Sequence, residues 1–224
     1  LDVGCGAGAS TRALAAAGTE VTGVDISPDL IALASSRGGS FRLGDAATMT
    51  FEAPFDAIFS RFGAMFFAEP VAAWTHLRTQ TVRGARLVIV CFRDAAGSEW
   101  ATLPRAALRP VLGDLPAAED GAPGPFIWSD PARFRAILGD AGWQDIAWRP
   151  LEMDVALSDE GAEDPVADAL GAMATAGPLG RLLGEAGEKA GAAKAAVAEA
   201  LAAKLHEGRV RIGIRAWIIT ARAP

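Results

Sequence analysis

The chain has 224 residues, of which 51% are hydrophobic and 21% charged, and its net charge is −6. A chain of this length buries one good core, and no run approaches the roughly 18 apolar residues of a membrane span. No dense block of lysine and arginine occurs, which argues against nucleic acid as a partner. We expect a single domain over residues 1–224 that acts on a small molecule.

A glycine-rich turn follows a short apolar strand end at the start of the chain, and a helix over residues 10–17 comes next. Glycine lets a ligand lie close to the main chain, and a helix start offers free N–H donors. Gly4, Gly6 and Ala9 match the spacing of dinucleotide-binding turns, and Asp25 follows at about the distance of a ribose-binding acid. An NAD(P)-dependent oxidoreductase is therefore one interpretation.

Asp2 and Gly8 favour a different cofactor. The acid precedes the glycines, and Gly8 follows Gly6 by two residues, so the stretch resembles the first motif of class I S-adenosylmethionine-dependent methyltransferases. A carboxylate here suits a cofactor with an ammonium group, whereas it would repel a pyrophosphate. The resemblance implies cofactor contacts from Asp2, Gly4, Cys5, Gly6 and Gly8.

The second strand ends in a segment that resembles the family's second motif, Val24-Asp25-Ile26. The resemblance implies that Asp25 accepts hydrogen bonds from both ribose hydroxyls, which the two oxygens of one carboxylate allow. It also implies that Ile26 packs on adenine. A helix over residues 28–36 is expected next, capped by Ser27 with a proline at its first position.

Gly44, Asp45 and Ala46 follow a third short strand and resemble the family's adenine-edge motif. The resemblance implies that Asp45 accepts from the exocyclic amine and that the Ala46 N–H donates to the ring. A plain Gly-Asp turn is the alternative interpretation.

Residues 55–63 look like the fourth strand and its exit loop, and residues 60–67 have the form Ser-Arg-Phe-Gly-x-Met-Phe-Phe that family members often show. The resemblance implies that this loop faces the methionine half of the cofactor and the acceptor. Core packing is the alternative for at least two of its four large apolar side chains. The implied cofactor contacts are Ser60, Arg61 and Phe62, and the implied acceptor contacts are Met65 and Phe66.

A helix over residues 70–82 and a turn at 83–85 lead to the apolar run 87–92, which is typical of a central parallel strand. Residues 94–130 are rich in proline and suggest a helix near 100–112 and then an irregular loop. In the family, substrate-facing elements are inserted at this point.

The candidate catalytic residues are Arg61, Asp94 and Glu99. A base is needed only if the acceptor must lose a proton, and Asp94 and Glu99 lie just beyond the fifth strand. A solvated loop acid is the alternative for each. Arg61 is a candidate for orienting an anionic group of the acceptor, and otherwise pairs with a surface carboxylate. Phe62 and Trp100 are candidate pocket walls, because aromatic faces tolerate a sulfonium.

The remaining sequence predicts a helix over residues 131–138, capped by Asp130, and a strand over 143–155. Residues 158–208 form an alanine-rich block of three helices with a break at Gly177-Pro178. The third helix is expected to include Leu205 and His206. This block is interpreted as a helical cap over the acceptor pocket, or as a packing insertion or dimer contact. A last strand spans 210–221.

The resemblance implies an α/β fold: a Rossmann-like seven-stranded sheet with helices on both faces, its last strand antiparallel, and cap insertions at 94–130 and 158–208. The implied reaction is in-line methyl transfer from S-adenosylmethionine to a small-molecule acceptor, giving S-adenosylhomocysteine. The ubiquinone/menaquinone-biosynthesis-like methyltransferases are the members it most resembles. A non-catalytic nucleotide-binding or assembly module is a further alternative.

Two cysteines, Cys5 and Cys91, lack metal-ligand neighbours at zinc spacing, so no metal is expected. Such sparing cysteine use is typical of a reducing, cytoplasmic setting. Because the family places a helix before the first strand, we also expect the chain to be truncated at its amino terminus, with a weakened affinity for the cofactor.

Overall fold

The computed structural model describes residues 1–115, 124–158, 161–176 and 179–224. The chain forms two compact units. The first contains residues 1–93, 121–150 and 216–224, and the second contains 94–120 and 151–215. The predicted break at Gly177-Pro178 and part of the predicted irregular loop lie outside the described residues.

The first five strands are parallel, and the last long strand is antiparallel to its neighbour, as predicted. The sheet order is β3-β2-β1-β4-β5-β8-β6, with β7 attached to β8, which makes eight strands in the described chain. The strands are β1 (Asp2–Val3), β2 (Thr22–Asp25), β3 (Ser40–Leu43), β4 (Phe55–Arg61), β5 (Thr81–Phe92), β6 (Gln144–Ala156), β7 (Leu205–His206) and β8 (Arg209–Arg222).

In the first unit α-helices follow β1, β2 and β4, whereas β3 leads to β4 without a helix, and the remaining helices cluster mostly in the second unit. They are α1 (Ala9–Ala16), α2 (Pro28–Ser36), α3 (Pro70–Thr79), α4 (Glu99–Leu112), α5 (Pro131–Asp140), α6 (Pro165–Ala176), α7 (Leu179–Glu185) and α8 (Ala190–Ala202), with short 3₁₀ turns η1 (Ala64–Phe66) and η2 (Gly187–Lys189). Both predicted caps are present: the Leu30 N–H donates to Ser27 Oγ at 3.3 Å, and the Ala132 N–H donates to Asp130 Oδ1 at 2.9 Å.

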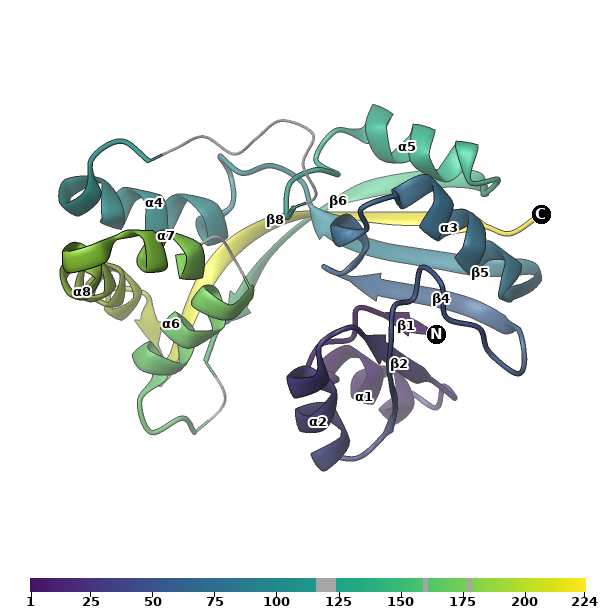
Figure 1. Ribbon diagram of the computed structural model, residues 1–224, viewed down its shortest axis with the longest axis horizontal. Helices are drawn as coiled ribbons and strands as arrows, with labels where there is room; N and C mark the ends of the chain where they lie inside the picture. The colour runs from purple at the N-terminus through teal and green to yellow at the C-terminus, as the bar shows by residue number, and fades with distance from the viewer. Residues whose placement is uncertain (116–123, 159–160, 177–178) are drawn as a thin grey trace. The chain divides into compact units, whose positions relative to one another are not determined.

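Helices cover both faces of the sheet in the first unit. Figure 1 shows α1 and α2 on one face, and α3 and α5 on the other. Between α3, α5 and the sheet lie the fully buried side chains of Trp74, Trp128 and Phe134, and the Trp143 indole N–H donates to the Trp74 carbonyl at 3.1 Å. This packing fixes β4 and β5, whose carboxyl ends carry part of the predicted site.

The second unit has its own apolar core, built by α4, α6, α7 and α8 with the start of β8. Its buried residues are Leu108, Ala169, Leu170, Met173, Leu179, Leu182, Ala193, Val197, Leu201 and Val210. The two predicted insertions therefore supply one helical body rather than two separate loops.

Three predicted boundaries are wrong. The predicted turn at 83–85 lies inside β5, where Gly84 adopts a φ of 76°. The helix predicted over 70–82 ends at Thr79. Leu205 and His206 form β7 instead of a helix end, because Glu207 and Gly208 have φ values of 49° and 74°. Two successive positive φ values make a tight hairpin turn.

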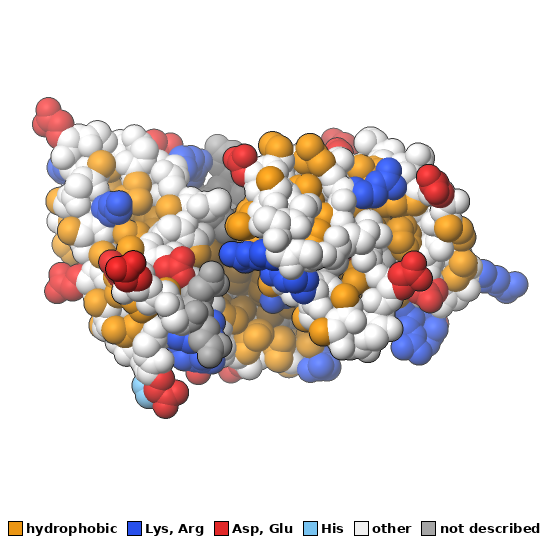
Figure 2. Space-filling view, turned by 90° about the horizontal axis from the view of Figure 1, so that it is seen from below, with side chains coloured by type: hydrophobic (Ala, Val, Ile, Leu, Met, Phe, Trp, Pro, Cys, Tyr) orange, Lys and Arg blue, Asp and Glu red, His pale blue; other side chains and the backbone are white. Residues whose placement is uncertain are grey.

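No helix in the described part of the chain is both long and apolar enough to cross a membrane. The face in Figure 2 carries acidic and basic side chains in small, separated groups among apolar and uncharged surface. Charge on this face is therefore mixed rather than concentrated in one field.

Candidate functional site

The glycine turn after β1 is fastened to the end of β2. The N–H groups of Gly4 and Cys5 both donate to the Val24 carbonyl, at 2.9 and 3.1 Å. Gly4, Gly6 and Gly8 have φ values of 69°, 55° and 79°. These left-handed angles are strained for other residues, so the turn depends on its glycines.

The three glycines have different surroundings. A Cβ at Gly4 would lie 2.8 Å from the Cα of Gly63, and a Cβ at Gly8 would lie 2.5 Å from the Phe41 ring. A Cβ at Gly6 would meet nothing within 4 Å. Gly4 and Gly8 therefore serve close packing within the protein, whereas Gly6 presents bare backbone to open space that a ligand can occupy.

Asp2 is fully buried and only half satisfied. Its Oδ2 accepts hydrogen bonds from Ser10 Oγ and Thr11 Oγ1, both at 2.7 Å, while its Oδ1 has no partner among the described residues. Gly23 makes room for this network, since a Cβ there would lie 2.7 Å from Thr11 Oγ1. A buried carboxylate oxygen without a donor is costly, and a cationic group close by would compensate it.

Asp25 joins the first two loops. Its Oδ2 accepts from the Gly6 N–H at 2.8 Å and its Oδ1 from the Ser27 N–H at 3.0 Å. Each oxygen keeps a second lone pair, so the half-buried carboxylate can still accept from a ligand. Ile26 beside it is 72% exposed, so its apolar side chain is free to pack on a ligand.

The loop after β3 presents a donor and an acceptor. The Gly44 N–H donates to the Asp25 carbonyl at 3.0 Å, which draws this loop to the end of β2. Asp45 is exposed, and its Oδ1 accepts from the Ala47 N–H at 2.9 Å. The Ala46 N–H makes no hydrogen bond within the described part of the chain. The loop therefore offers Asp45 Oδ2 and the Ala46 N–H to a ligand.

The three cofactor contacts predicted at the carboxyl end of β4 have different surroundings. Ser60 is fully buried and donates its hydroxyl to the Val3 carbonyl at 2.8 Å, so it joins β4 to β1. Arg61 is exposed, and its guanidinium has neither a hydrogen bond nor an ion pair to described residues. Phe62 has a φ of 60° and stacks on Phe92, with ring centroids 4.5 Å apart. A left-handed conformation is uncommon for a bulky side chain, so the packing around Phe62 must hold it there.

The two predicted acceptor contacts in this loop differ in exposure. Met65 is 1% exposed and packs in the core, whereas Phe66 is 52% exposed. Phe126 packs on Phe92 at 5.1 Å, so Phe62, Phe92 and Phe126 form an aromatic cluster at the carboxyl ends of β4 and β5. Sequence reasoning missed Phe92 and Phe126, although Phe92 ends the predicted fifth strand.

The remaining candidates belong to the second unit. Asp94 Oδ1 accepts from the Gly97 N–H and lies 4.0 Å from Arg215 Nη1. Glu99 is paired with Lys204 and accepts from the Gly213 N–H at 2.7 Å. Burial raises the pKa of Glu99, but the hydrogen bonds from Lys204 and Gly213 outweigh it, so its pKa is lowered overall. This favours a structural role. Trp100 packs against the core of the helical unit.

Both cysteines are inert. Burial, followed by the charges of Asp2 and Asp25, raises the pKa of the Cys5 thiol to about 12. Burial alone raises the pKa of Cys91 to about 12. Neither thiol ionises at neutral pH, so neither acts as a nucleophile.

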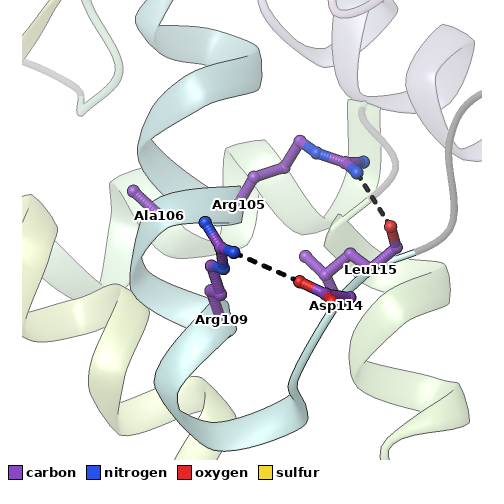
Figure 3. Close-up of a pocket in the computed structure, with 5 residues that line it drawn as sticks. All are labelled: Arg105, Ala106, Arg109, Asp114 and Leu115. Carbon is purple, nitrogen blue, oxygen red and sulfur yellow. Dashed lines mark hydrogen bonds and ion pairs between the residues drawn. The ribbon is translucent and has the colours of Figure 1, made fainter.

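Described residues of the second unit line two cavities. The first, of about 330 Å³, is lined by Arg105, Ala106, Arg109, Asp114 and Leu115. Figure 3 shows Arg105 donating to the Leu115 carbonyl and Arg109 paired with Asp114, at 3.1 and 3.4 Å. Both guanidinium groups thus secure the chain after α4. The second cavity, of about 360 Å³, is lined by Gly97, Glu152, Met153, Asp154, Gly213, Ile214 and Arg215.

Comparison with known proteins agrees with this geometry. Residues 1–89 match the family described as "Methyltransferase domain". The demethylmenaquinone methyltransferase of Mycolicibacterium vanbaalenii is 28% identical over 160 residues, which cover 67% of this chain and 70% of the relative.

Solved structures share the fold. A putative methyltransferase from Bacillus halodurans superposes with a TM-score of 0.55 at 15% identity, covering 100% of this chain and 91% of the other. Phosphoethanolamine N-methyltransferase 2 of Haemonchus contortus, solved with S-adenosylhomocysteine, gives 0.55 at 16% identity over 100% of this chain and 48% of the other. Identities this low establish the fold alone.

The glycine turn and the acids at the strand ends, together with the family match and the similar methyltransferases, support an enzyme that uses S-adenosylmethionine rather than a nicotinamide cofactor. Residues 1–89 match a methyltransferase domain, and the chain is similar to demethylmenaquinone methyltransferases, which together support a class I S-adenosylmethionine-dependent methyltransferase of the menaquinone- and ubiquinone-biosynthesis-like type.

Proposed function

We propose that the loops after β1, β2 and β3 hold S-adenosylmethionine, and that the aromatic cluster receives a small acceptor with a planar, apolar ring. Two observations support the cofactor's fit: the open space in front of Gly6 and the unpartnered Asp2 Oδ1. The cofactor's ammonium group supplies the positively charged partner that Asp2 Oδ1 lacks. Cys5 and Gly8 shape the turn beneath it.

The adenosine contacts come from the next two loops. Asp25 accepts from the ribose hydroxyls through the lone pairs that Gly6 and Ser27 leave free. Ile26 covers one face of adenine, and Asp45 and Ala46 meet its amine and ring nitrogen. Ser60 acts indirectly, because its hydroxyl is bonded to Val3.

The proposal of a planar ring acceptor rests on the aromatic cluster. Phe62 is held in a left-handed conformation against Phe92, and Phe126 extends the apolar wall. Aromatic rings prefer to stack on or pack edge-on against other rings. Phe66 extends this surface, whereas Met65 supports it from the core. The similarity to demethylmenaquinone methyltransferases agrees with a ring of the hydroquinone type.

Most of the catalysis comes from holding the acceptor atom, the methyl carbon and the sulfur in line. S-adenosylmethionine provides a sulfonium methyl group for in-line displacement, and orientation of the acceptor accounts for up to about 7–11 kcal/mol of barrier lowering in ideal cases. Arg61 orients an acceptor oxygen, since its guanidinium is exposed and has no partner in the described chain. Base catalysis by Asp94 or Glu99, and a pocket wall from Trp100, stay predictions.

The reaction takes place in the cytoplasm in this proposal, where two buried, unpaired thiols are expected.

The test is turnover with matched acceptors. Purified protein and S-adenosylmethionine are incubated with a naphthohydroquinone, a catechol or a primary amine, and S-adenosylhomocysteine is quantified by mass spectrometry. Turnover of a ring acceptor, with a higher KM in Phe126→Leu and an unchanged KM in the control Phe51→Leu, supports the proposal. Turnover of the amine alone contradicts it.

A further inference from the structure

The loop that carries Asp45 and Ala46 is anchored by a side chain outside any motif. His76, on α3, bonds from Nε2 to the Met49 carbonyl at 2.8 Å. A carbonyl only accepts, so the imidazole nitrogen is the donor. Met49 in turn donates its N–H to the Asp45 carbonyl at 2.9 Å, which closes one turn of chain.

Met49 connects this anchor to the motif a second time. A Cβ at Gly44 would overlap the Met49 Cε methyl group, so the Met49 side chain lies directly over Gly44. The Gly44 N–H is itself bonded to the Asp25 carbonyl. Asp45 and Ala46 therefore lie between two fixed points, the end of β2 and the His76–Met49 contact.

Gln80, the residue that follows α3, also secures the far end of the loop. Gln80 Oε1 accepts from the Phe51 N–H at 3.2 Å, and the Gln80 carbonyl accepts from the Phe55 N–H at 2.8 Å. The loop is therefore held in place before a ligand binds, and binding costs little conformational entropy.

We propose that His76 is a positioning residue for adenine recognition: through Met49 it holds the Asp45 carboxylate and the Ala46 N–H in the spacing that matches the adenine amine and ring nitrogen. This inference rests on the adenine contacts given under Proposed function. It adds that α3, which supplies no ligand contact, sets the specificity for the base.

The test compares two nucleosides that differ on the edge of the base that Asp45 and Ala46 contact. S-adenosylhomocysteine carries the amine that Asp45 accepts from and an unprotonated N1, whereas S-inosylhomocysteine carries a carbonyl and an N1–H there. Both affinities are measured by calorimetry for wild type, His76→Phe, His76→Gln and Met49→Ala. His206→Phe is the matched control, because His206 lies in β7 of the helical unit. Thermal midpoints verify folding.

Wild type should bind the inosyl compound about tenfold or more weakly, because its carbonyl faces a carboxylate. His76→Phe should weaken adenosyl binding about three- to tenfold, the range for one lost hydrogen bond, and should weaken inosyl binding less. The ratio of affinities then narrows. His76→Gln, which keeps an N–H donor, should restore it, Met49→Ala should narrow it, and His206→Phe should leave it unchanged.

Equal losses for both nucleosides, or an unchanged ratio in both His76→Phe and Met49→Ala, would overturn the role of His76 and leave the adenine contacts standing. A wild type that binds both nucleosides equally would instead remove the Asp45 assignment, and the role of His76 with it.

Discussion

Replacement of Asp25 by alanine tests the centre of the site. Its carboxylate accepts two backbone N–H groups, from Gly6 and Ser27, at 2.8 and 3.0 Å, and is assigned to the ribose. Two consequences follow, one for folding and one for binding, and they can be measured separately.

The folding cost is moderate. Two hydrogen bonds to a charged acceptor are lost, but the site is half-buried and water can replace part of them, so we expect about 1–2 kcal/mol. For a chain of this size that corresponds to a fall of about 2–8 °C in the thermal midpoint. The binding cost adds the lost ribose hydrogen bonds, about 1–3 kcal/mol, which raises Kd about 5- to 150-fold.

Titration calorimetry with S-adenosylhomocysteine measures the second quantity on folded protein. Asp25→Asn should fall between alanine and wild type, because the amide keeps one acceptor oxygen. Asp29→Ala, in the first turn of α2, is the matched control and should change Kd less than twofold. If folded Asp25→Ala binds as tightly as wild type, the carboxylate does not contact ribose and the site as drawn is wrong.

Three further outcomes are expected. Gly4→Ala should cost about 2–4 kcal/mol of stability, because its Cβ meets the Gly63 backbone at a left-handed φ. Gly6→Ala should cost only about 1–2 kcal/mol but should lose most S-adenosylhomocysteine binding. Denaturant melts measure the first effect and calorimetry the second, and equal results for both variants would refute their separate roles. The pKa of Glu99 is lowered in the folded protein, so its ionised form contributes stability that is fully present above the ordinary value of 4.5 and is lost as pH falls below it. Glu99→Gln should therefore flatten the fall in unfolding free energy below pH 4.5. With pKa values near 12, Cys5 and Cys91 should resist iodoacetamide at pH 8 until the protein is denatured; rapid labelling of the native protein would show that their burial is overstated.

Local signals in the sequence sufficed for most elements. The Ser27-Pro28 pair predicts the start of α2, and Asp130 predicts the cap of α5, because a cap needs only its own next residues. The parallel order follows from alternating strands and helices. Acids at successive strand ends therefore meet at one edge, as the hydrogen bonds of Asp25 to the first and third loops show.

Other features depend on distant parts of the chain. The spacing of Leu201 and Leu205 continues a helical pattern, yet the reversal at Glu207 and Gly208 pairs Leu205 with Val210. Gly208 between two short segments was the available signal, although Glu-Gly is not among the preferred hairpin pairs. The burial of Met65, the bond from Ser60 to Val3 and the anchoring of Met49 by His76 depend on tertiary neighbours that no local pattern specifies.

The contact between Gly4 and Gly63 has a consequence for evolutionary divergence and for engineering. Each position lacks room for a methyl group because the other backbone fills that space. Homologues should therefore retain both glycines, although the two are far apart in sequence. Anyone transplanting the nucleoside pocket onto another scaffold must carry both glycines, since a side chain at either position would collide with the backbone at the other.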